Sequence, residues 1–400
     1  MKKDRSDALI TYAWCRSSYV ALRSLNQLGL TVTLSDSHLI GMGQQSRYNK
    51  IFYRYKSPLS QPRDFIIDIN NILHITRARF LLPVHDETVI LAQNRDLLPR
   101  DIILPIHSYE KLEFANDKNK MADFAENLGL PVPRKIHWHT IEDLELKLLN
   151  ENGPWVVKLR KGNSAKGVFY PHSNAELIEL VQQLITEYQL SSDRYPIIQE
   201  RVEGEGWGVS CLYWEGQRLA SFSHKRLREK TSTGGTSTLR MSARNPLLEE
   251  IAHKILDSMN WHGLAMVEFK YNSETGQGWF IEINPRLWGS IHLAVASGVD
   301  FPALLFIAAT KGPKRVIDNL QPYKEGLVAR WYLGDSIVGA NQLRHGKVLS
   351  ALKMLLPGGA DTYDDWFWDD LGASFGQAAY YFYNFLKYRS LNPEQDGMLG

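Results

Sequence analysis

Two glutamates and an asparagine in apolar surroundings are the residues best suited to chemistry. Glu268 stands in Val-Glu-Phe, and Glu282 and Asn284 stand in Ile-Glu-Ile-Asn-Pro-Arg. Strand alternation places Glu282 and Asn284 on one face, and a buried carboxylate needs a partner. Hard oxygen donors suit Mg²⁺ held with nucleotide phosphates. Arg286, which follows directly, could hold a phosphate or an anionic intermediate. The alternative is a sheet edge whose acids face water.

A lysine at a strand end and a glycine-bearing loop precede these acids. Lys158 closes the apolar run Val156-Val157, and Gly162 and Gly167 follow it. Such a lysine can reach phosphate oxygens, and glycines let a backbone approach a polyphosphate closely. The loop lacks the glycine spacing of a P-loop, so it is not a Walker motif. A surface hairpin turn would explain this segment equally well.

A second lysine pair opens a helix predicted over residues 117–128. Asp117 has the residue type of an N-cap, and Lys118 and Lys120 follow it. A lysine at a helix start opposes the helix dipole, which makes a phosphate partner plausible. The pattern is equally typical of two exposed lysines, and it leaves open which of them would contact a phosphate.

Two further segments suit the remaining parts of a nucleotide or its co-substrate. The predicted strand 196–200 runs into an acidic turn that holds Gly204 and Gly206, whose backbone could meet an adenine edge. A solvated acidic turn is the alternative. The basic strand end 224–230 lies beside a Thr/Ser/Gly loop and suits an anionic ligand. A charged surface strand would also produce this pattern.

The order of these motifs resembles that of the ATP-grasp superfamily, which includes biotin carboxylase, carbamoyl-phosphate synthetase and D-alanine–D-alanine ligase. The resemblance covers roughly residues 9–310, and the stretch 199–235 is similar to a branch of predicted ATP-dependent carboxylate–amine ligases, or carboligases. It implies a ligase that activates a carboxylate as an acyl phosphate and couples it to an amine, releasing ADP and phosphate. The alternatives are a bicarbonate-activating enzyme of the carboxylase type and a non-catalytic ATP-binding sensor or scaffold.

The resemblance also implies a role for each motif residue, with ATP and one or two Mg²⁺ ions (or Mn²⁺ in their place) as cofactors. The implied catalytic residues are Arg286, Arg226 and Lys158. The implied ATP-binding residues are Lys118, Lys158, Gly162, Ser164, Gly167, Gln199, Glu200, Val202 and Glu205. The implied metal ligands are Glu268, Glu282 and Asn284. Glu205 is a candidate only, because Glu-Gly-Trp-Gly departs from the usual position of the ribose-binding acid.

The elements that must position these residues fall into two classes. Strands alternating with helices near the N-terminus predict a parallel α/β sheet, and an α+β region rich in antiparallel strands follows. With the resemblance, this predicts a pre-ATP-grasp domain (1–116), a central lobe (117–195), a C-terminal lobe (196–311) and a mainly helical extension (312–400). The first strand is not followed by Gly-x-Gly-x-x-Gly, which disfavours a dinucleotide-binding enzyme.

Two other segments carry open interpretations. The residues His85-Asp86-Glu87 follow a short buried strand, where an open α/β sheet often binds ligand. We expect a helix cap there, with substrate contact as the alternative. The aromatic segment 374–387 is expected to be a helix packed on the body or on a partner subunit, with a membrane-surface contact as the sharper alternative.

Composition limits the partners and the compartment. The 400 residues exceed one ordinary core, and 46 basic against 44 acidic side chains leave a formal net charge of only +2. This balance argues against nucleic acid and against a polybasic membrane anchor. Two cysteines and no long apolar run predict a cytoplasmic protein without an integral membrane segment. The expected partners are small carboxylate and amine substrates, and a homodimer is the commonest assembly.

Overall fold

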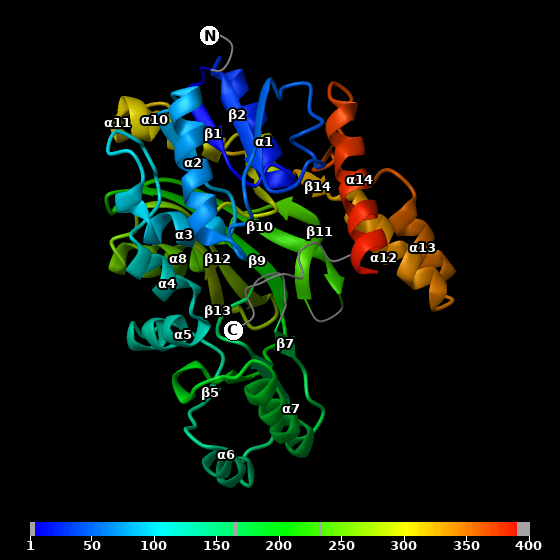
Figure 1. Ribbon diagram of the computed structural model, residues 1–400. Helices are drawn as coiled ribbons and strands as arrows, with labels where there is room; N and C mark the ends of the chain where they lie inside the picture. The colour runs from blue at the N-terminus through cyan, green and yellow to red at the C-terminus, as the bar shows by residue number, and fades with distance from the viewer. Residues whose placement is uncertain (1–4, 163–166, 232–233, 390–400) are drawn as a thin grey trace.

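The chain builds three sheets that lie one above another. A computed structural model describes residues 5–162, 167–231 and 234–389. Within them, Figure 1 shows the N-terminal sheet at the top, a long twisted sheet in the middle and a small sheet in the lower lobe. The predicted functional residues are distributed over the lower two sheets and the helix between them, so their meeting depends on this stacking.

The N-terminal sheet consists of four short parallel strands in the order β3-β2-β1-β4. Its strands are β1 (Ala8–Ile10), β2 (Val32–Asp36), β3 (Ile51–Arg54) and β4 (Phe80–Leu82), and its helices are α1 (Arg16–Gln27), α2 (Pro62–Thr76) and α3 (Glu87–Gln93). The strands β1, β2 and β4 are buried throughout, as expected of a parallel sheet covered on both faces. The predicted parallel α/β architecture is confirmed.

The small sheet forms the lower lobe and is antiparallel, in the order β5-β8-β6-β7. Its strands are β5 (Lys135–Ile136), β6 (Trp155–Lys158), β7 (Val168–Phe169) and β8 (Ile197–Glu200), and its helices are α6 (Ile141–Leu148) and α7 (Asn174–Glu187). This lobe has its own core, in which Leu144, Val157, Val181 and Ile198 are buried together. The chain enters it through α4 (Tyr109–Asn116) and α5 (Lys118–Asn127).

The large sheet has seven strands in the order β13-β12-β9-β10-β11-β14-β15, antiparallel except for the last pair. Its strands are β9 (Glu205–Trp214), β10 (Gln217–Thr231), β11 (Gly234–Ser242), β12 (Gly263–Asn272), β13 (Gln277–Asn284), β14 (Val328–Arg330) and β15 (Thr362–Tyr363). Helix α8 (Pro246–Ser258) packs on one face, where Val209, Val267 and Phe280 are buried.

The other face of the large sheet changes character along its strands. At one end Phe222 and Met266 pack into the core shared with β1, α9 (Ile291–Ala296) and α10 (Phe301–Lys311). Alternation then places Arg226 on β10 and Glu268 on β12 further along this same face, beyond the apolar packing. One face of the large sheet is thus apolar at one end of its strands and charged further along them.

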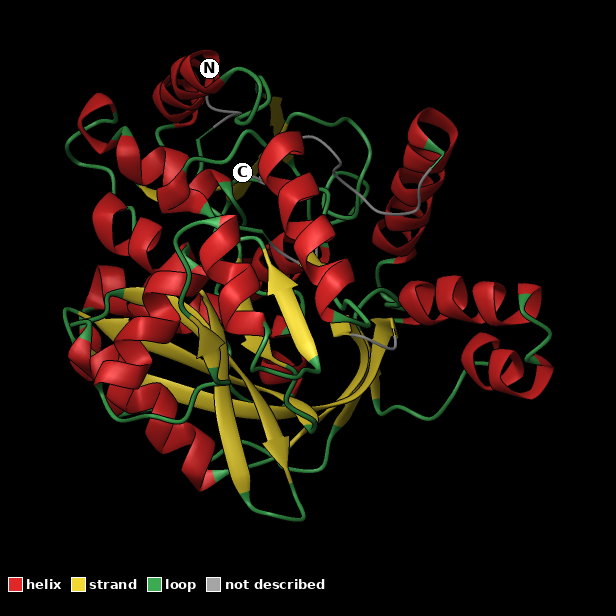
Figure 2. Cartoon of the chain, turned by 90° about the horizontal axis from the view of Figure 1, so that it is seen from below, coloured by secondary structure: helices red, strands yellow, loops and turns green. Residues whose placement is uncertain are grey.

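The C-terminal part is mainly helical, as predicted. Its helices are α11 (Pro313–Ile317), α12 (Tyr332–Arg344), α13 (Val348–Leu355) and α14 (Leu371–Tyr388). The strands β14 and β15, which were not predicted, extend the large sheet. The two views in Figures 1 and 2 show α12 and α13 as a hairpin that projects beyond the end of this sheet.

The aromatic helix α14 packs on the body of the protein. Tyr380 stacks on Trp14 with ring centroids 4.3 Å apart, and Tyr381 meets Trp331 at 6.0 Å. Among the helices of the described residues, none is long and apolar enough to cross a membrane. The division into four units with the boundaries given above stays a prediction.

Candidate active site

The three predicted metal ligands meet on the two neighbouring strands β12 and β13. Glu268 pairs directly with Glu282 across the two strands. Asn284 donates a hydrogen bond from Nδ2 to Oε1 of Glu268 at 2.9 Å. The two carboxylates and the amide therefore share one small region of the charged sheet face, as alternation predicted. Because all three offer hard oxygen atoms, this donor set fits Mg²⁺.

Arg226 reaches this group from β10. Its Nη2 lies 2.6 Å from Oε2 of Glu268, and its Nη1 lies 3.1 Å from Oε1 of Glu229. The strand between, β9, has Gly206 and Gly208 on the charged face. A Cβ at Gly206 would stand 2.9 Å from Cδ of Arg226, so the glycine leaves the room that this arginine occupies. Glu229 was not among the predicted residues.

Lys118 approaches from the start of α5. Asp117 caps this helix by accepting from the N–H groups of Asn119 and Lys120. The Nζ of Lys118 lies 3.2 Å from Oε2 of Glu282 and donates to the carbonyl of Gly162 at 2.8 Å. Lys120 is exposed. The structure therefore directs Lys118, and not Lys120, to the charged group.

Lys158 approaches from β6 in the lower lobe. It is buried and donates from Nζ to Oε1 of Gln199 at 2.9 Å, so two predicted ATP-binding residues contact each other. Burial lowers the pKa of Lys158 to about 8; Glu282 opposes this shift, whereas Lys118 and Lys270 add to it. Lys270 follows Glu268 by two positions on the same face of β12 and was missed, although strand alternation could have identified it.

The two glutamates have opposite pKa shifts. Burial raises the pKa of Glu268, and the facing charge of Glu282 adds to this, although Arg226 acts against it. Burial also acts to raise the pKa of Glu282, but Lys118, Lys158 and Arg226 outweigh it and lower this pKa. A site that keeps one carboxylate firmly ionised beside a second, less acidic one is typical of functional positions.

The glycine-bearing loop meets this group at Gly162, whereas Gly167 at its other described end contacts Leu159. Gly162 has φ +143° and Gly167 has φ +70°, conformations that favour glycine. Lys161, between the strand and the loop, pairs with Glu113 of α4 at 2.6 Å. Ser164, predicted to bind ATP, lies outside the described residues.

The residues predicted to bind adenine and ribose converge less closely than the predicted metal ligands. Glu200 has an exposed side chain that lies 3.6 Å from Arg134, away from Lys158, and Val202 is half-buried in the segment after β8. Glu205 pairs with Lys225 at 2.5 Å. Because β9 begins at Glu205 itself, alternation puts this side chain on the face of Trp207, opposite to Glu268. The side chain of Glu205 therefore does not join the charged group, and its ribose contact stays a prediction.

A cavity of about 230 Å³ lies beside this group. Its charged and polar lining residues include Asp86, Glu113, Lys118, Lys161, Glu282, Asn284 and Arg286. Arg286 Nε lies 3.4 Å from Oδ1 of Asp86, the residue before α3. The charged sheet face, the loop after β6 and the start of α3 therefore all border one cavity.

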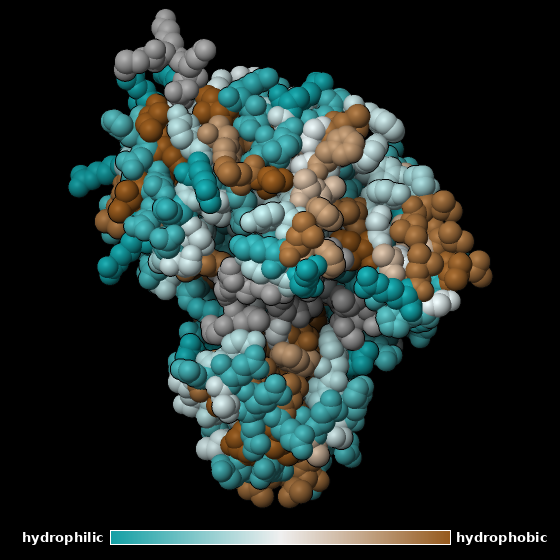
Figure 3. All heavy atoms as spheres, turned by 45° about the vertical axis from the view of Figure 1, so that its right-hand side comes forward, coloured by the Kyte–Doolittle hydropathy of each residue, from teal (hydrophilic) through white to brown (hydrophobic). Residues whose placement is uncertain are grey.

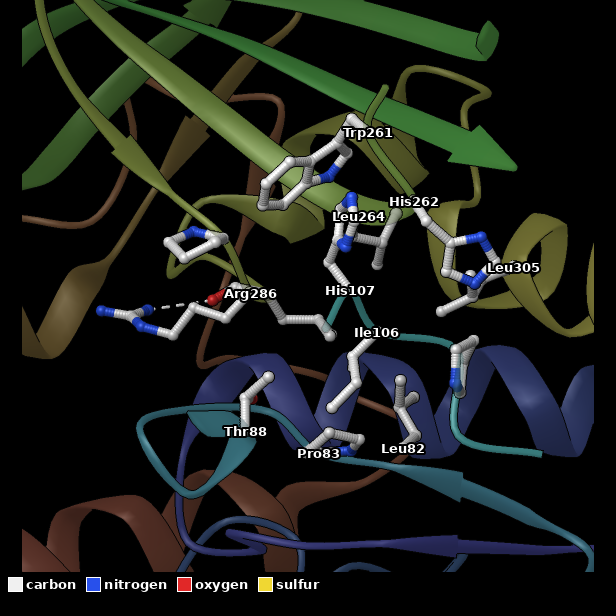
Figure 4. Close-up of a pocket in the computed structure, with 13 residues that line it drawn as sticks. Leu82, Pro83, Thr88, Ile106, His107, Trp261, His262, Leu264, Arg286 and Leu305 are labelled. Carbon is white, nitrogen blue, oxygen red and sulfur yellow. Dashed lines mark hydrogen bonds between the residues drawn. The ribbon is translucent and has the colours of Figure 1, made fainter. Parts of the chain in front are cut away.

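Arg286 also borders a second cavity of only about 10 Å³, too small for more than a water molecule. Figure 4 shows Ile106, Trp261 and Leu264 around it, with the guanidinium of Arg286 turned away and bonded to the carbonyl of Leu287. This smaller cavity is a packing gap between the N-terminal sheet and the large one.

The segment after β4 serves two purposes. Glu87 is buried and accepts hydrogen bonds from the N–H groups of Val84 and His85 and from the hydroxyl of Thr11, so it fixes the turn before α3. Asp86 instead faces the cavity through its contact with Arg286. The expected helix cap is not formed, because Asp86 at the N-cap position of α3 makes no side-chain capping hydrogen bond, and substrate contact by this segment stays a prediction.

Comparisons with known proteins agree with this geometry. Residues 192–332 match a family model described as "ATP-grasp in the biosynthetic pathway with Ter operon". Acetyl-CoA carboxylase 1 of Arabidopsis thaliana is 28% identical over 143 residues, which are 34% of this chain but only 6% of that protein.

Two solved structures share the fold over most of the chain. Biotin carboxylase of Campylobacter jejuni, in complex with an ATP analogue, has a TM-score of 0.63 at 14% identity, covering 82% of this chain and 75% of that one. The L-amino acid ligase of Bacillus licheniformis has a TM-score of 0.55 at 17% identity, covering 77% and 75%. The family model thus identifies residues 192–332 as an ATP-grasp segment, and the two solved structures show that most of the chain shares their fold.

Proposed function

We propose that this protein is an ATP- and Mg²⁺-dependent ligase that activates a carboxylate as an acyl phosphate and couples it to an amine. The observation that carries the proposal is the convergence of Glu268, Glu282 and Asn284 with Lys118 and Lys158 beside one cavity. The superfamily includes enzymes of this type, such as the L-amino acid ligase that shares its fold.

The charges of the site favour a polyphosphate. Its cationic side chains are Lys118, Lys158, Arg226 and Lys270, and its acidic side chains are Glu229, Glu268 and Glu282. The lysines come from different elements and are buried or half-buried. The low local dielectric at such positions strengthens a contact with phosphate. A nucleotide triphosphate would supply the negative charge that this group lacks.

Each part of the site has a distinct task in this proposal. Lys118 and Lys158 hold phosphate oxygens, and Mg²⁺ bound through Glu268, Glu282 and Asn284 would offset the charge on the transferred phosphoryl group. The backbone of Gly162, whose carbonyl accepts from Lys118, would border the nucleotide. Exclusion of water from the site would protect a reactive intermediate from hydrolysis. The adenine would lie toward Gln199 and the backbone of Glu200 and Val202.

The chemistry proceeds in two steps. A carboxylate oxygen of the substrate attacks the γ-phosphorus, the bond to the bridging oxygen breaks, and ADP leaves. The amine nitrogen then attacks the acyl carbon, loses a proton, and phosphate leaves to give an amide. Arg286 and Arg226 stabilise the negative charge that develops on oxygen in these steps. No side chain serves as nucleophile.

The test is nucleotide turnover with paired substrates. Purified protein with ATP, Mg²⁺ and panels of carboxylates and amines should release ADP and phosphate in equal amounts, only when both substrates are present. Formation of AMP and pyrophosphate would contradict the proposal, because it requires attack at a different phosphorus.

Bicarbonate activation is the second candidate, and the similarity to biotin carboxylase and to acetyl-CoA carboxylase 1 favours it. Bicarbonate is itself a carboxylate-like oxygen nucleophile and would use the same lysines and acids. Bicarbonate-dependent ADP formation without any amine would replace the ligase proposal by this one.

A further inference from the structure

The hairpin formed by α12 and α13 exposes an apolar stripe to solvent. Its inner side is close-packed, because a Cβ at Gly339 would stand 3.0 Å from Leu355, and Ala351 is fully buried. Its outer side bears exposed large apolar side chains: Leu343, Val348, Leu349, Leu352 and Leu356. In Figure 3 apolar atoms gather over this projection at the right edge of the molecule. The outer members of α13 recur at helical spacing, as on an amphipathic helix.

The charge around this stripe is of one sign. The 25 residues 336–360 contain no aspartate or glutamate, while Arg344, Lys347 and Lys353 are exposed among the leucines. Of the two flanking acids, Asp335 is buried and paired with Arg228 and Arg330 at the root of the hairpin, and Asp361 is exposed but accepts from the N–H of Val328 on β14. Although the net charge of the whole chain is close to zero, this projection is both cationic and apolar.

We infer that the α12–α13 hairpin docks the protein on a membrane surface rich in anionic lipid. Exposed leucines flanked by lysine and arginine fit the boundary between acyl chains and negatively charged headgroups. The helices are too short and too polar to span the bilayer, so the contact is peripheral. The catalytic cavity, built from α5, β6, β12 and β13, lies outside this hairpin and is not part of the contact.

A second copy of the chain would fit this surface less well. A symmetric interface through the stripe would bring the same patch of both subunits together, so Arg344, Lys347 and Lys353 would face like charges. Helix α14 also exposes Phe375 and Phe382, but its basic residues stand only at its end, with Lys387. On the hairpin, in contrast, exposed apolar and cationic side chains coincide.

The experiment is cosedimentation of the full-length chain with lipid vesicles. The protein should bind vesicles of phosphatidylcholine mixed with phosphatidylglycerol, and binding should weaken with salt and be absent with phosphatidylcholine alone. The double variant Leu349→Glu/Leu352→Glu should reduce the bound fraction more than tenfold. Replacing Arg344, Lys347 and Lys353 by Gln should reduce it about a hundredfold, since each basic side chain contributes about fivefold.

The matched control is Leu149→Glu at the end of α6. Leu149 is 78% exposed and Leu349 is 79% exposed, but Leu149 lies beside acids such as Glu145 and Glu151. This variant should bind vesicles like the parent protein, and unchanged thermal unfolding and ATP turnover should accompany every variant. Equal binding to both vesicle types, or none, would overturn the inference. So would a concentration-dependent dimer that Leu349→Glu dissolves, which would assign the stripe to a second copy.

Discussion

Two groups of buried charges include side chains of the large sheet, and the first of them borders the cavity of about 230 Å³. The first is the cleft group: Lys118, Lys158, Arg226, Glu268 and Glu282. The second is the strut group, in which Asp364 accepts from Arg16 at 2.6 Å and pairs with Arg240, both acid and Arg240 being fully buried. In both groups, ion pairs join side chains from several helices and strands, so the presence of ion pairs alone does not distinguish the two groups.

The difference lies in what the charges connect. Asp364 joins α1, β11 and the segment after β15, three parts far apart in the sequence, and its pKa is lowered because Arg240 and Arg16 outweigh its burial. The cleft group instead keeps opposite pKa shifts on two facing glutamates beside a cavity of about 230 Å³. Ion pairs without accessible space hold segments together, whereas pairs beside a cavity can exchange a side-chain partner for a ligand.

Removing the shared acid of the strut group should have the largest effect. Asp364→Ala leaves Arg16 and Arg240 without their common partner in a buried place, which should lower the free energy of unfolding by about 3–5 kcal/mol. Urea denaturation followed by circular dichroism measures this. The exposed pair Arg79–Asp101 provides a control, because Asp101→Ala should cost less than about 1 kcal/mol. A small loss for Asp364→Ala would mean that the two groups are not different in kind.

The complementary change in the cleft group should affect turnover instead. Glu282→Gln keeps the shape but removes the charge opposite Lys118, and should lower ADP formation roughly 10²–10³-fold. The free energy of unfolding in urea should fall less than for Asp364→Ala, because the Glu282 side chain is 21% exposed and glutamine keeps its shape. Glu274→Gln in the exposed turn after β12 is the control and should leave both quantities unchanged. If Glu282→Gln retains full ATP-dependent activity, a non-catalytic nucleotide-binding role becomes the better explanation.

The sequence predicted those parts of the site that depend on strand period. Glu282 and Asn284 alternate with isoleucines on one strand, and Lys158 closes an apolar run, so their side-chain directions follow from local spacing alone. The parallel N-terminal sheet was likewise predicted from strands alternating with helices. These features depend on residues close together in the sequence, so the spacing of residues is sufficient to predict them.

The sequence could not reveal features set by packing between elements. The choice between Lys118 and Lys120 depends on how α5 rotates against β13, and the partner of Arg226 depends on the β9–β10–β12 register. The strands β14 and β15 contain three and two residues, too few to show alternation. Helix α2 had a usable signal, since Phe65, Ile69 and Leu73 are buried at helical spacing, and it was overlooked.

A smaller effect, the pH dependence of ATP affinity, should also separate the cleft group from the strut group. Burial lowers the pKa of Lys158 from 10.5 to about 8, so this lysine is charged below pH 8 and loses its proton above it. Nucleotide phosphates favour the charged form, and binding above pH 8 must therefore take up a proton. The apparent affinity for ATP should fall by up to about tenfold per pH unit above 8. Titration calorimetry in two buffers of different ionisation enthalpy measures both quantities.

The matched variant for this effect is Lys158→Arg. A guanidinium stays charged across this range, so the variant should bind ATP with an affinity that is flat between pH 7 and 10. The sign for stability is opposite: without nucleotide, the folded state holds fewer protons on Lys158 than the unfolded chain between about pH 8 and 10.5, so its contribution to stability rises with pH in that window. The same slope in the arginine variant would assign the titration to another group.

The smallest effect is expected on the opposite face of the same sheet. Glu205 and Lys225 form a partly exposed pair there, and Glu205→Gln should change the free energy of unfolding by less than about 1 kcal/mol. Because alternation turns this side chain away from Glu268, the KM for ATP should stay within about twofold, the scale of a solvated hydrogen bond. Lys225→Gln should give the same result. A tenfold rise in KM for Glu205→Gln alone would show that the end of β9 turns toward the nucleotide. The alternation of side chains between the two faces would then begin after Glu205.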